Sequence, residues 1–255
     1  MSKIREYHRP TSVAAALALL GRPGMTSVAL AGGTQVTPQL VDSDYALDMA
    51  VDAVVDLQAV GLTGVERHGE RLTLGAMVRL QTLVETAEAP ALVREMARLE
   101  GPNTLRQMGT IGGLVASGNP ESECLAALLL FDAEVQIQGR SGETRMTLAD
   151  FWAQGSAALD GGLVTAVTIA TTGQTASDRV ARTPADTPIV AALARRTDDG
   201  NLRLALCGVA ATPRLVTPEE VATLNPAGDF RGSSAYRRQM ALVLSRRVVE
   251  QVTNN

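Results

Sequence analysis

Short apolar runs separated by glycines and polar turns organise the first part of the chain. Thr11 or Ser12 is suited to cap a helix, and Gly21 follows the apolar run AAALALL at the point where a helix should stop. The pattern predicts, in order, this helix, a strand over 27–31, a helix over 35–41 with Pro38 in its first turn, and a strand over 54–57. The strand over 27–31 runs directly into two glycines.

The middle of the chain alternates hairpin patterns with helical patterns. Apolar positions flank the turn HGE and predict a hairpin, and a second hairpin is expected where glycines separate two alternating runs. The elements expected are a hairpin of 65–67 with 72–74, helices over 78–87, 90–99 and 122–131, a hairpin of 134–138 with 144–148, and a strand over 163–169. The glycine-rich stretch 101–113 is expected to be a loop.

From about residue 175 the pattern changes again. The segment TTGQTAS, 171–177, has the composition of a linker, so we place a domain boundary near 172–176. Strands are expected over 188–196 and 202–211 around a DDGN turn, and a helix is expected to start at Thr217. The last predicted helix covers 234–252, and its expected basic outer face consists of Arg237, Arg238, Arg246 and Arg247.

Composition narrows the classes of protein. At 255 residues the chain exceeds one typical compact domain, so two or three units are expected. The net charge of −4 and the absence of a densely basic stretch argue against nucleic-acid binding. The longest apolar runs, such as 125–131, are too short to cross a membrane, and the N-terminus does not resemble a signal peptide.

Cysteine usage restricts the redox chemistry. Cys124 and Cys207 are the only cysteines and lie far apart, which favours a reducing, cytoplasmic compartment. Together with His8 and His68 they are too few and too scattered for an iron–sulfur cluster or a zinc site. Any redox centre is therefore organic or belongs to a partner, and we expect both histidines to be solvated surface residues.

The first candidate for chemistry is the loop LAGGTQ, 30–35. Glycines allow a ligand to approach the backbone, and a following helix adds partial positive charge, which together suit a pyrophosphate. A simple tight turn between strand and helix would give the same pattern. The loop matches neither the GxGxxG nor the GxxxxGK[ST] phosphate motif.

The second candidate is the run GTIGGLVASGNPESE, 109–123. It has four glycines and few side chains to pack, so it is costly to order unless it binds a ligand or forms a bulge. Two such loops could clamp a flavin dinucleotide between them. No nucleophile or acid–base pattern is found, so no catalytic residue and no metal ligand is assigned.

These two loops carry a family resemblance. LAGGTQ followed by RQMGTIGG resembles the FAD-binding subunit of the xanthine dehydrogenase and aerobic carbon-monoxide dehydrogenase family of molybdenum hydroxylases. Further likeness lies in 126–137, 182–192 and 233–248. The resemblance implies an α+β fold with a two-part vanillyl-oxidase-like (PCMH-type) FAD-binding domain, 1–58 and 59–173, and a small C-terminal α+β domain, 174–255.

The resemblance also implies a function. FAD would be bound non-covalently and would pass electrons from [2Fe-2S] clusters to an external acceptor. The partners would be a large molybdopterin subunit and a small [2Fe-2S] subunit in a dimer of heterotrimers. The cofactor contacts implied are Ala31, Gly32, Gly33, Thr34, Gln35, Thr110, Gly112, Gly113, Ser117, Glu123, Leu163 and Arg179. In this picture the first five wrap the pyrophosphate through backbone N–H groups, and Thr110, Gly112 and Gly113 close the other side.

Three departures from the family pattern leave alternatives open. The family's Asn after TIGG is Leu114 here, its Asp near the ribose or adenine is Glu123, and the stretch 224–229 is short. The first two motivate an alternative, a scaffold subunit of the same kind of complex that has lost FAD. A stand-alone flavoenzyme is the third hypothesis, but it would need an acid–base group that the sequence does not show.

Overall fold

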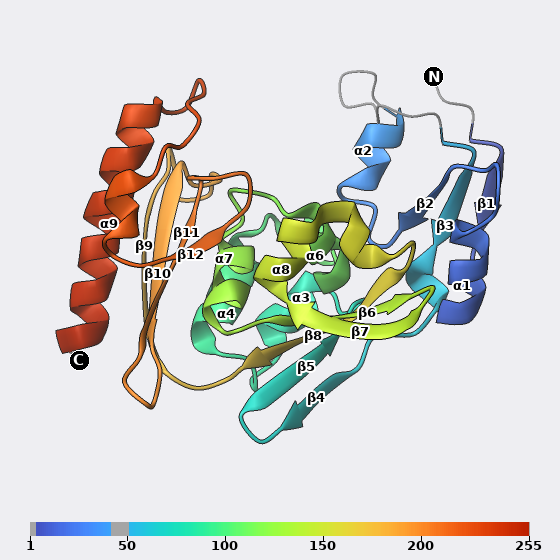
Figure 1. Cartoon of the computed structure of the whole chain (residues 1–255), viewed down its shortest axis with the longest axis horizontal. Coiled ribbons are helices and arrows are strands. Elements are labelled where there is room, and N and C mark those ends of the chain that lie inside the picture. The colour runs from blue at the N-terminus through green and yellow to red at the C-terminus, as the bar shows by residue number, and fades with distance from the viewer. Residues whose placement is uncertain (1–3, 42–50, 255) are drawn as a thin grey trace.

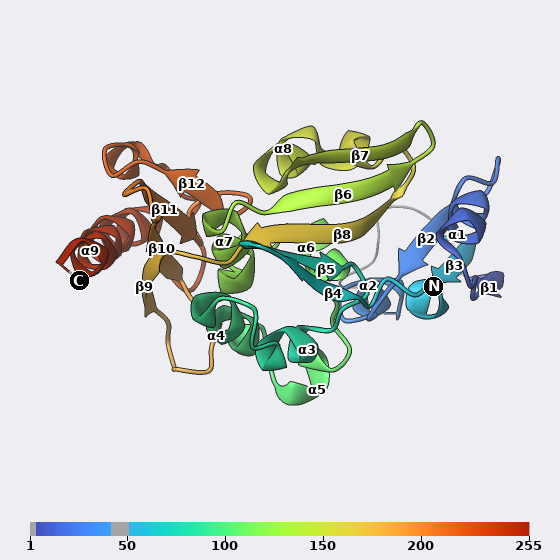
Figure 2. The same cartoon turned by 90° about the horizontal axis from the view of Figure 1, so that it is seen from below.

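The computed structural model describes residues 4–41 and 51–254, which form three β-sheets arranged in a row (Figures 1 and 2). A three-stranded sheet lies at one end, a five-stranded sheet in the middle and a four-stranded sheet at the other end. Within the described ranges no helix has the length and apolar character that a membrane span requires.

The N-terminal unit is a parallel sheet in the order β1-β3-β2. Its elements are β1 (Glu6–His8), α1 (Val13–Leu20), β2 (Ser27–Leu30), α2 (Val36–Val41), β3 (Ala53–Asp56) and the 3-10 turn η2 (Leu57–Ala59). Ser12 caps α1 by accepting from the Ala15 N–H at 3.2 Å, and Gly21 ends it, as predicted. Because β2 and β3 are parallel, the loop after β2 begins at the carboxyl edge of the sheet.

The middle unit is an antiparallel sheet in the order β4-β5-β8-β6-β7. Its elements are β4 (Val65–His68), β5 (Arg71–Gly75), α3 (Leu80–Glu85), α4 (Ala91–Leu99), α5 (Asn103–Arg106), α6 (Ile111–Ser117), α7 (Glu123–Leu130), β6 (Glu134–Gly139), β7 (Gly142–Thr147), α8 (Leu148–Gln154), the 3-10 turn η3 (Gly155–Leu159) and β8 (Leu163–Ala170). Both predicted hairpins are present, β4 with β5 and β6 with β7.

Three helices in this unit were not predicted. The stretch 101–113, expected to be a loop, contains α5 and the start of α6. Glycines weaken a helix, but burial of Ile111 and Val115 in the core offsets that penalty, and Thr110 caps α6 through its Oγ1. Likewise α8 starts at Leu148, which was expected to end a strand, because Thr147 accepts from the Asp150 N–H at 3.1 Å.

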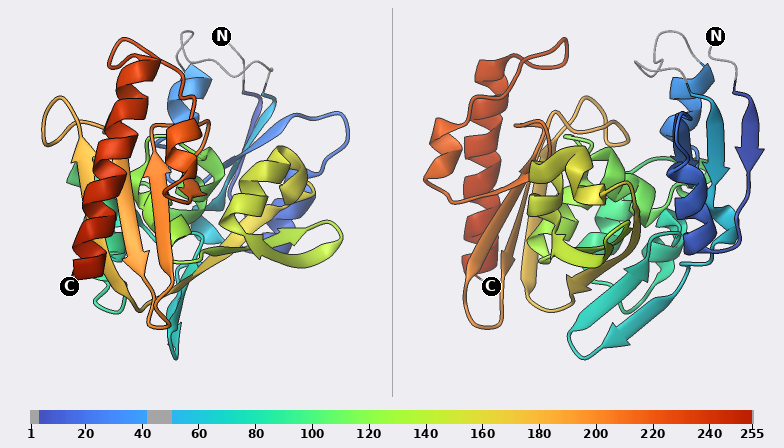
Figure 3. Two further views of the ribbon diagram at one scale, coloured as in Figure 1. Left: turned by 60° about the vertical axis from the view of Figure 1, so that its left-hand side comes forward. Right: turned by 45° about the vertical axis from the view of Figure 1, so that its right-hand side comes forward.

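The C-terminal unit is an antiparallel sheet in the order β12-β11-β10-β9, covered by one long helix. Its elements are β9 (Gln174–Val180), β10 (Val190–Arg196), β11 (Leu202–Cys207), β12 (Arg214–Val216), the 3-10 turn η4 (Glu220–Thr223) and α9 (Ser234–Asn254). Figure 3 shows α9 lying across β9 and β10.

Three expectations for this unit were wrong. The predicted linker 171–177 overlaps β9, which is an edge strand, and its polar composition reflects that edge position. The predicted helix at Thr217 is only the turn η4, although Thr217 and Glu220 do form the expected reciprocal cap. Arg237 does not lie on an outer face: it is 3% exposed and donates to the carbonyls of Ile189 and Gly208.

The helix α7 is the centre of the molecule, between the middle unit and the C-terminal sheet (Figure 1). All eight of its residues are buried. The strands β10 and β11 are apolar on both faces, because alternate side chains meet α7 and α9. The residues on the α7 side are Ala191, Leu193, Ala205 and Cys207.

The position of α7 predicts a large stability cost for Leu128→Ala. Leu128 is fully buried, so the truncation leaves a cavity and should lower the free energy of unfolding by about 2–5 kcal/mol. Denaturant unfolding of both proteins measures this difference. As a control, Leu202→Ala, at a position 39% exposed, should change it by less than about 0.5 kcal/mol. Equal denaturation midpoints for Leu128→Ala and Leu202→Ala would show that α7 is not the core shared by the middle unit and the C-terminal sheet.

Candidate cofactor-binding site

 The two glycine-rich loops meet backbone to backbone. A Cβ atom on Gly32 would overlap the carbonyl oxygen of Met108 and lie 3.0 Å from the Gly109 Cα. Only glycine leaves room for this approach. The loop after β2 and the loop before α6 are far apart in sequence, but this contact brings them together in the structure.

The first loop has unpaired backbone donors. In the described part of the chain, the N–H groups of Gly32, Gly33, Thr34 and Gln35 donate to no acceptor. Gly33 has a φ of +73°, a left-handed conformation that favours glycine. A turn of successive free N–H groups is suited to an anion, so these residues fit a diphosphate.

The second loop is different, because most of its backbone N–H groups already donate to acceptors within this chain. The N–H groups of Ile111, Gly112 and Gly113 donate to Val78 O at 2.9 Å, Ala76 O at 2.8 Å and Thr110 Oγ1 at 3.2 Å. Thr110 is 4% exposed; its hydroxyl proton is not used in these bonds, and its N–H has no acceptor among the described residues. Thr110 is thus the residue of this loop best able to donate to a ligand.

Gly112 has a packing role that the sequence did not indicate. It is buried, and a Cβ atom there would lie 2.8 Å from the Ala76 Cβ and 3.0 Å from the Ala76 carbonyl oxygen. The glycine therefore lets α6 approach the end of β5. A Cβ on Gly113 would meet only the Thr110 Oγ1, at 3.1 Å.

Ser117 and Leu114 lie on α6 itself. Ser117 is the last residue of the helix, is exposed, and donates to Leu114 O at 2.7 Å. Leu114 is 8% exposed and packs in the main core. The side chain that replaces the family's Asn is therefore accommodated by apolar neighbours.

Leu163 and Ala31 belong to the core that joins the first two units. Leu163, the first residue of β8, is 8% exposed and clusters with Val55 and Met77, and Ala31 packs against this cluster. The contact fixes the first glycine loop relative to the middle sheet.

Glu123 and Arg179 are brought together as an ion pair. The Arg179 Nε lies 3.1 Å from the Glu123 Oε1, in an alignment that is not a hydrogen bond. Glu123 is 4% exposed. Burial raises the pKa of Glu123 to about 7, with Arg179 lowering it and the nearby carboxylates of Glu100 and Glu95 raising it further.

A buried carboxylate beside the first loop was missed by the sequence reasoning. Asp56, at the carboxyl end of β3 and paired in register with Leu30, is 2% exposed. It accepts from the Tyr7 hydroxyl at 2.6 Å and the Gln58 N–H at 2.9 Å, and Arg9 Nε lies 3.5 Å away. The sequence signal that could have identified Asp56 is an acidic residue near the end of the strand predicted over 54–57.

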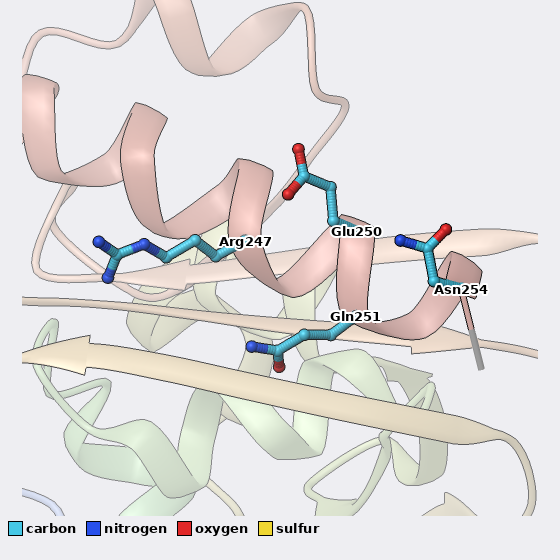
Figure 4. Close-up of a pocket in the computed structure, with 4 residues that line it drawn as sticks. All are labelled: Arg247, Glu250, Gln251 and Asn254. Carbon is cyan, nitrogen blue, oxygen red and sulfur yellow. The ribbon is translucent and has the colours of Figure 1, made fainter.

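The remaining polar candidates lie away from the loops. His68 is exposed as predicted, but His8 is half-buried, 2.7 Å from a Glu6 carboxylate oxygen. Cys124 and Cys207 are buried free thiols. A surface hollow on α9 is lined by Arg247, Glu250, Gln251 and Asn254 (Figure 4), and it lies at the opposite end of the molecule from β2 (Figure 1).

Comparison with known proteins identifies the class. Residues 2–171 match the family described as FAD binding domain in molybdopterin dehydrogenase. The chain is 31% identical to the carbon monoxide dehydrogenase medium chain of Afipia carboxidovorans, over 96% of each chain. It is 33% identical to the uncharacterized protein YgfM of Escherichia coli (strain K12), over 94% of this chain and 93% of that one.

A solved structure agrees with these sequence matches. A chain of reconstituted CO dehydrogenase from Oligotropha carboxidovorans superposes with a TM-score of 0.86 at 29% identity, covering 100% of this chain and 99% of that chain. The protein therefore belongs to the family of FAD-binding medium subunits of molybdenum hydroxylases. It is an oxidoreductase subunit with FAD as its cofactor, and the expected fold class is confirmed.

The close approach of the loops predicts that Gly32→Ala separates them. The added methyl group overlaps the Met108 carbonyl, so we expect a loss of unfolding free energy of about 1–3 kcal/mol together with weaker FAD binding. Thermal unfolding and FAD titration measure both effects. Gly64→Ala, where a Cβ atom would have only a Glu66 carboxylate oxygen at 3.6 Å, is the control. Equal unfolding free energies and equal FAD affinities for Gly32→Ala and Gly64→Ala would refute the contact.

The raised pKa of Glu123 predicts a pH-dependent stability. Because the folded protein holds this proton more tightly than the unfolded chain, the stabilisation is present at low pH and is lost as pH rises through about 7. Glu123→Gln cannot ionise, so its unfolding free energy relative to wild type should rise by about 2 kcal/mol from pH 5 to pH 8. Glu88→Gln, at an exposed position, is the control for replacing a surface carboxylate. A constant difference for Glu123→Gln would contradict the raised pKa.

Proposed function

We propose that this chain is the electron-transferring flavoprotein subunit of a molybdenum hydroxylase complex. FAD, bound non-covalently, supplies the chemistry of accepting electrons from [2Fe-2S] clusters on a partner and passing them to an external acceptor. The observation that carries the proposal is the meeting of Gly32 with Met108 and Gly109, beside a run of N–H groups that have no acceptor among the described residues.

We propose the following roles for the residues of the site. The amides of Gly32 to Gln35 bind the diphosphate, and the Thr110 hydroxyl donates from the other side. Gly112 and Gly113 shape the start of α6, while Ala31 and Leu163 fix the first loop. Glu123 and Arg179 border the site through their ion pair.

The partners follow from the same proposal. The relative from Afipia carboxidovorans is named a medium chain, which implies larger and smaller companions in that protein. We propose a large molybdopterin subunit and a small [2Fe-2S] subunit here, in a dimer of heterotrimers in the cytoplasm. The domain limits 1–58, 59–173 and 174–255 are proposed on the same basis, and each contains one of the three sheets.

Thr110→Val tests the cradle. Valine keeps the shape of threonine but removes the hydroxyl, so we expect the Kd for FAD to rise by about tenfold, as for the loss of one charge-assisted hydrogen bond. Thr110→Ser keeps the hydroxyl and should bind FAD nearly as wild type. Fluorescence titration of the apoprotein with FAD measures both constants. Equal affinity of the valine and serine variants would remove Thr110 from the site.

Gly112→Asp is a poorer test of this cradle. Its side chain would collide with Ala76 before reaching a ligand, so a loss of bound flavin could result from misfolding.

Co-purification tests the proposed assembly of subunits. A tagged chain expressed with its neighbours should retain a cysteine-rich small subunit and a large subunit, and a chain recovered alone with full flavin turnover would contradict the proposal.

A further inference from the structure

The C-terminal domain holds the connection between α6 and α7 at three points. The Gly208 N–H donates to Pro120 O at 2.7 Å. Arg231 forms an ion pair with Glu121, and Arg179 forms the ion pair with Glu123. All three contacts fall within residues 120–123, so this short segment is a concentrated interdomain contact.

The arginine that binds Glu121 is held in place by its own domain. Arg231 has a side chain 13% exposed, and its guanidinium lies 3.3 Å from the Asp229 Oδ2. Arg237, 3.7 Å from Glu121, donates to Ile189 O at 2.6 Å and to the Asp229 Oδ2 at 2.7 Å. Positive charge is therefore fixed before Glu121 meets it, which reduces the entropy lost in the contact.

Local hydrogen bonds also shape the connection: the Ser122 N–H donates to Asn119 O at 3.1 Å, and the Glu121 N–H donates to Asn119 Oδ1 at 3.1 Å. Gly118 ends α6 in a left-handed conformation, and Asn119 and Pro120 follow it. On the side of the middle unit, Glu100 accepts from the Ser122 hydroxyl at 2.5 Å and the Cys124 N–H at 3.1 Å. Arg179 and Arg231 contact the segment from the C-terminal domain, so contacts from both domains hold it in place.

We infer that the C-terminal domain clamps this connection through Glu121 and Arg231 and thereby positions α6 and Thr110 for FAD. Both are positioning residues, because they act through the segment that joins α6 to α7. The inference rests on the proposed placement of FAD against α6. The C-terminal domain then contributes to cofactor affinity from a contact outside the glycine loops.

Arg231→Met tests the clamp. Fluorescence titration of the apoprotein with FAD should give a Kd raised by on the order of tenfold, a typical coupling between sites. The visible circular dichroism of bound FAD should change as well, because the flavin surroundings shift. Glu121→Gln should behave in the same way, whereas Arg231→Lys, which keeps the charge, should restore most of the affinity.

Arg203→Met is the matched control. Arg203 pairs with Asp132 at 2.8 Å and also joins the C-terminal domain to the middle unit, but beyond the other end of α7. It should leave the Kd and the dichroism unchanged. Wild-type values in Arg231→Met, or an equal loss in Arg203→Met, would overturn the inference alone. A wild-type chain that takes up no FAD would overturn the proposed function too.

Discussion

Gly32 lies so close to the backbone at Met108 and Gly109 that a hydrogen atom is the only side chain with room there. This contact joins a loop of the N-terminal unit to a loop of the middle unit. In the described structure the N–H groups of Gly32 to Gln35 have no protein acceptors, and Thr110 directly follows Gly109 in the second loop. The proposed FAD site depends on this arrangement, since unpaired donors gathered in one place are what a diphosphate requires.

Packing in the rest of the fold fixes the position of that contact. The small core containing Leu163 and Met77 fixes the first loop against the middle sheet, and Gly112 lets α6 pack on Ala76. Farther away, α7 is buried between the middle unit and the C-terminal sheet. Each unit therefore contributes packing that places backbone atoms, and no single side chain defines the site.

Sequence patterns predicted most elements, because helix caps and alternating strands leave local signals. Ser12 and Gly21 mark α1, and the glycine turn marks the β6–β7 hairpin. The failures have tertiary causes. Burial made a helix of the glycine-rich stretch at Ile111, the sheet edge explains the polar strand β9, and Arg237 is buried against backbone carbonyls that are distant in sequence.

The candidate site shows the same division between local signals and distant contacts. The glycine motifs located both loops, but the sequence does not show that Gly112 serves packing or that Glu123 pairs with Arg179 across domains. Both depend on contacts between elements far apart along the chain. Glu121 and Arg231, 110 residues apart, are the same kind of case.

Ligand competition tests whether the two loops bind the diphosphate of FAD. The apoprotein would be titrated with FAD in the presence of ADP or of riboflavin. ADP, which carries the diphosphate, is expected to compete with FAD, and riboflavin, which lacks it, is expected to compete far less. Displacement of FAD by riboflavin but not by ADP would contradict it.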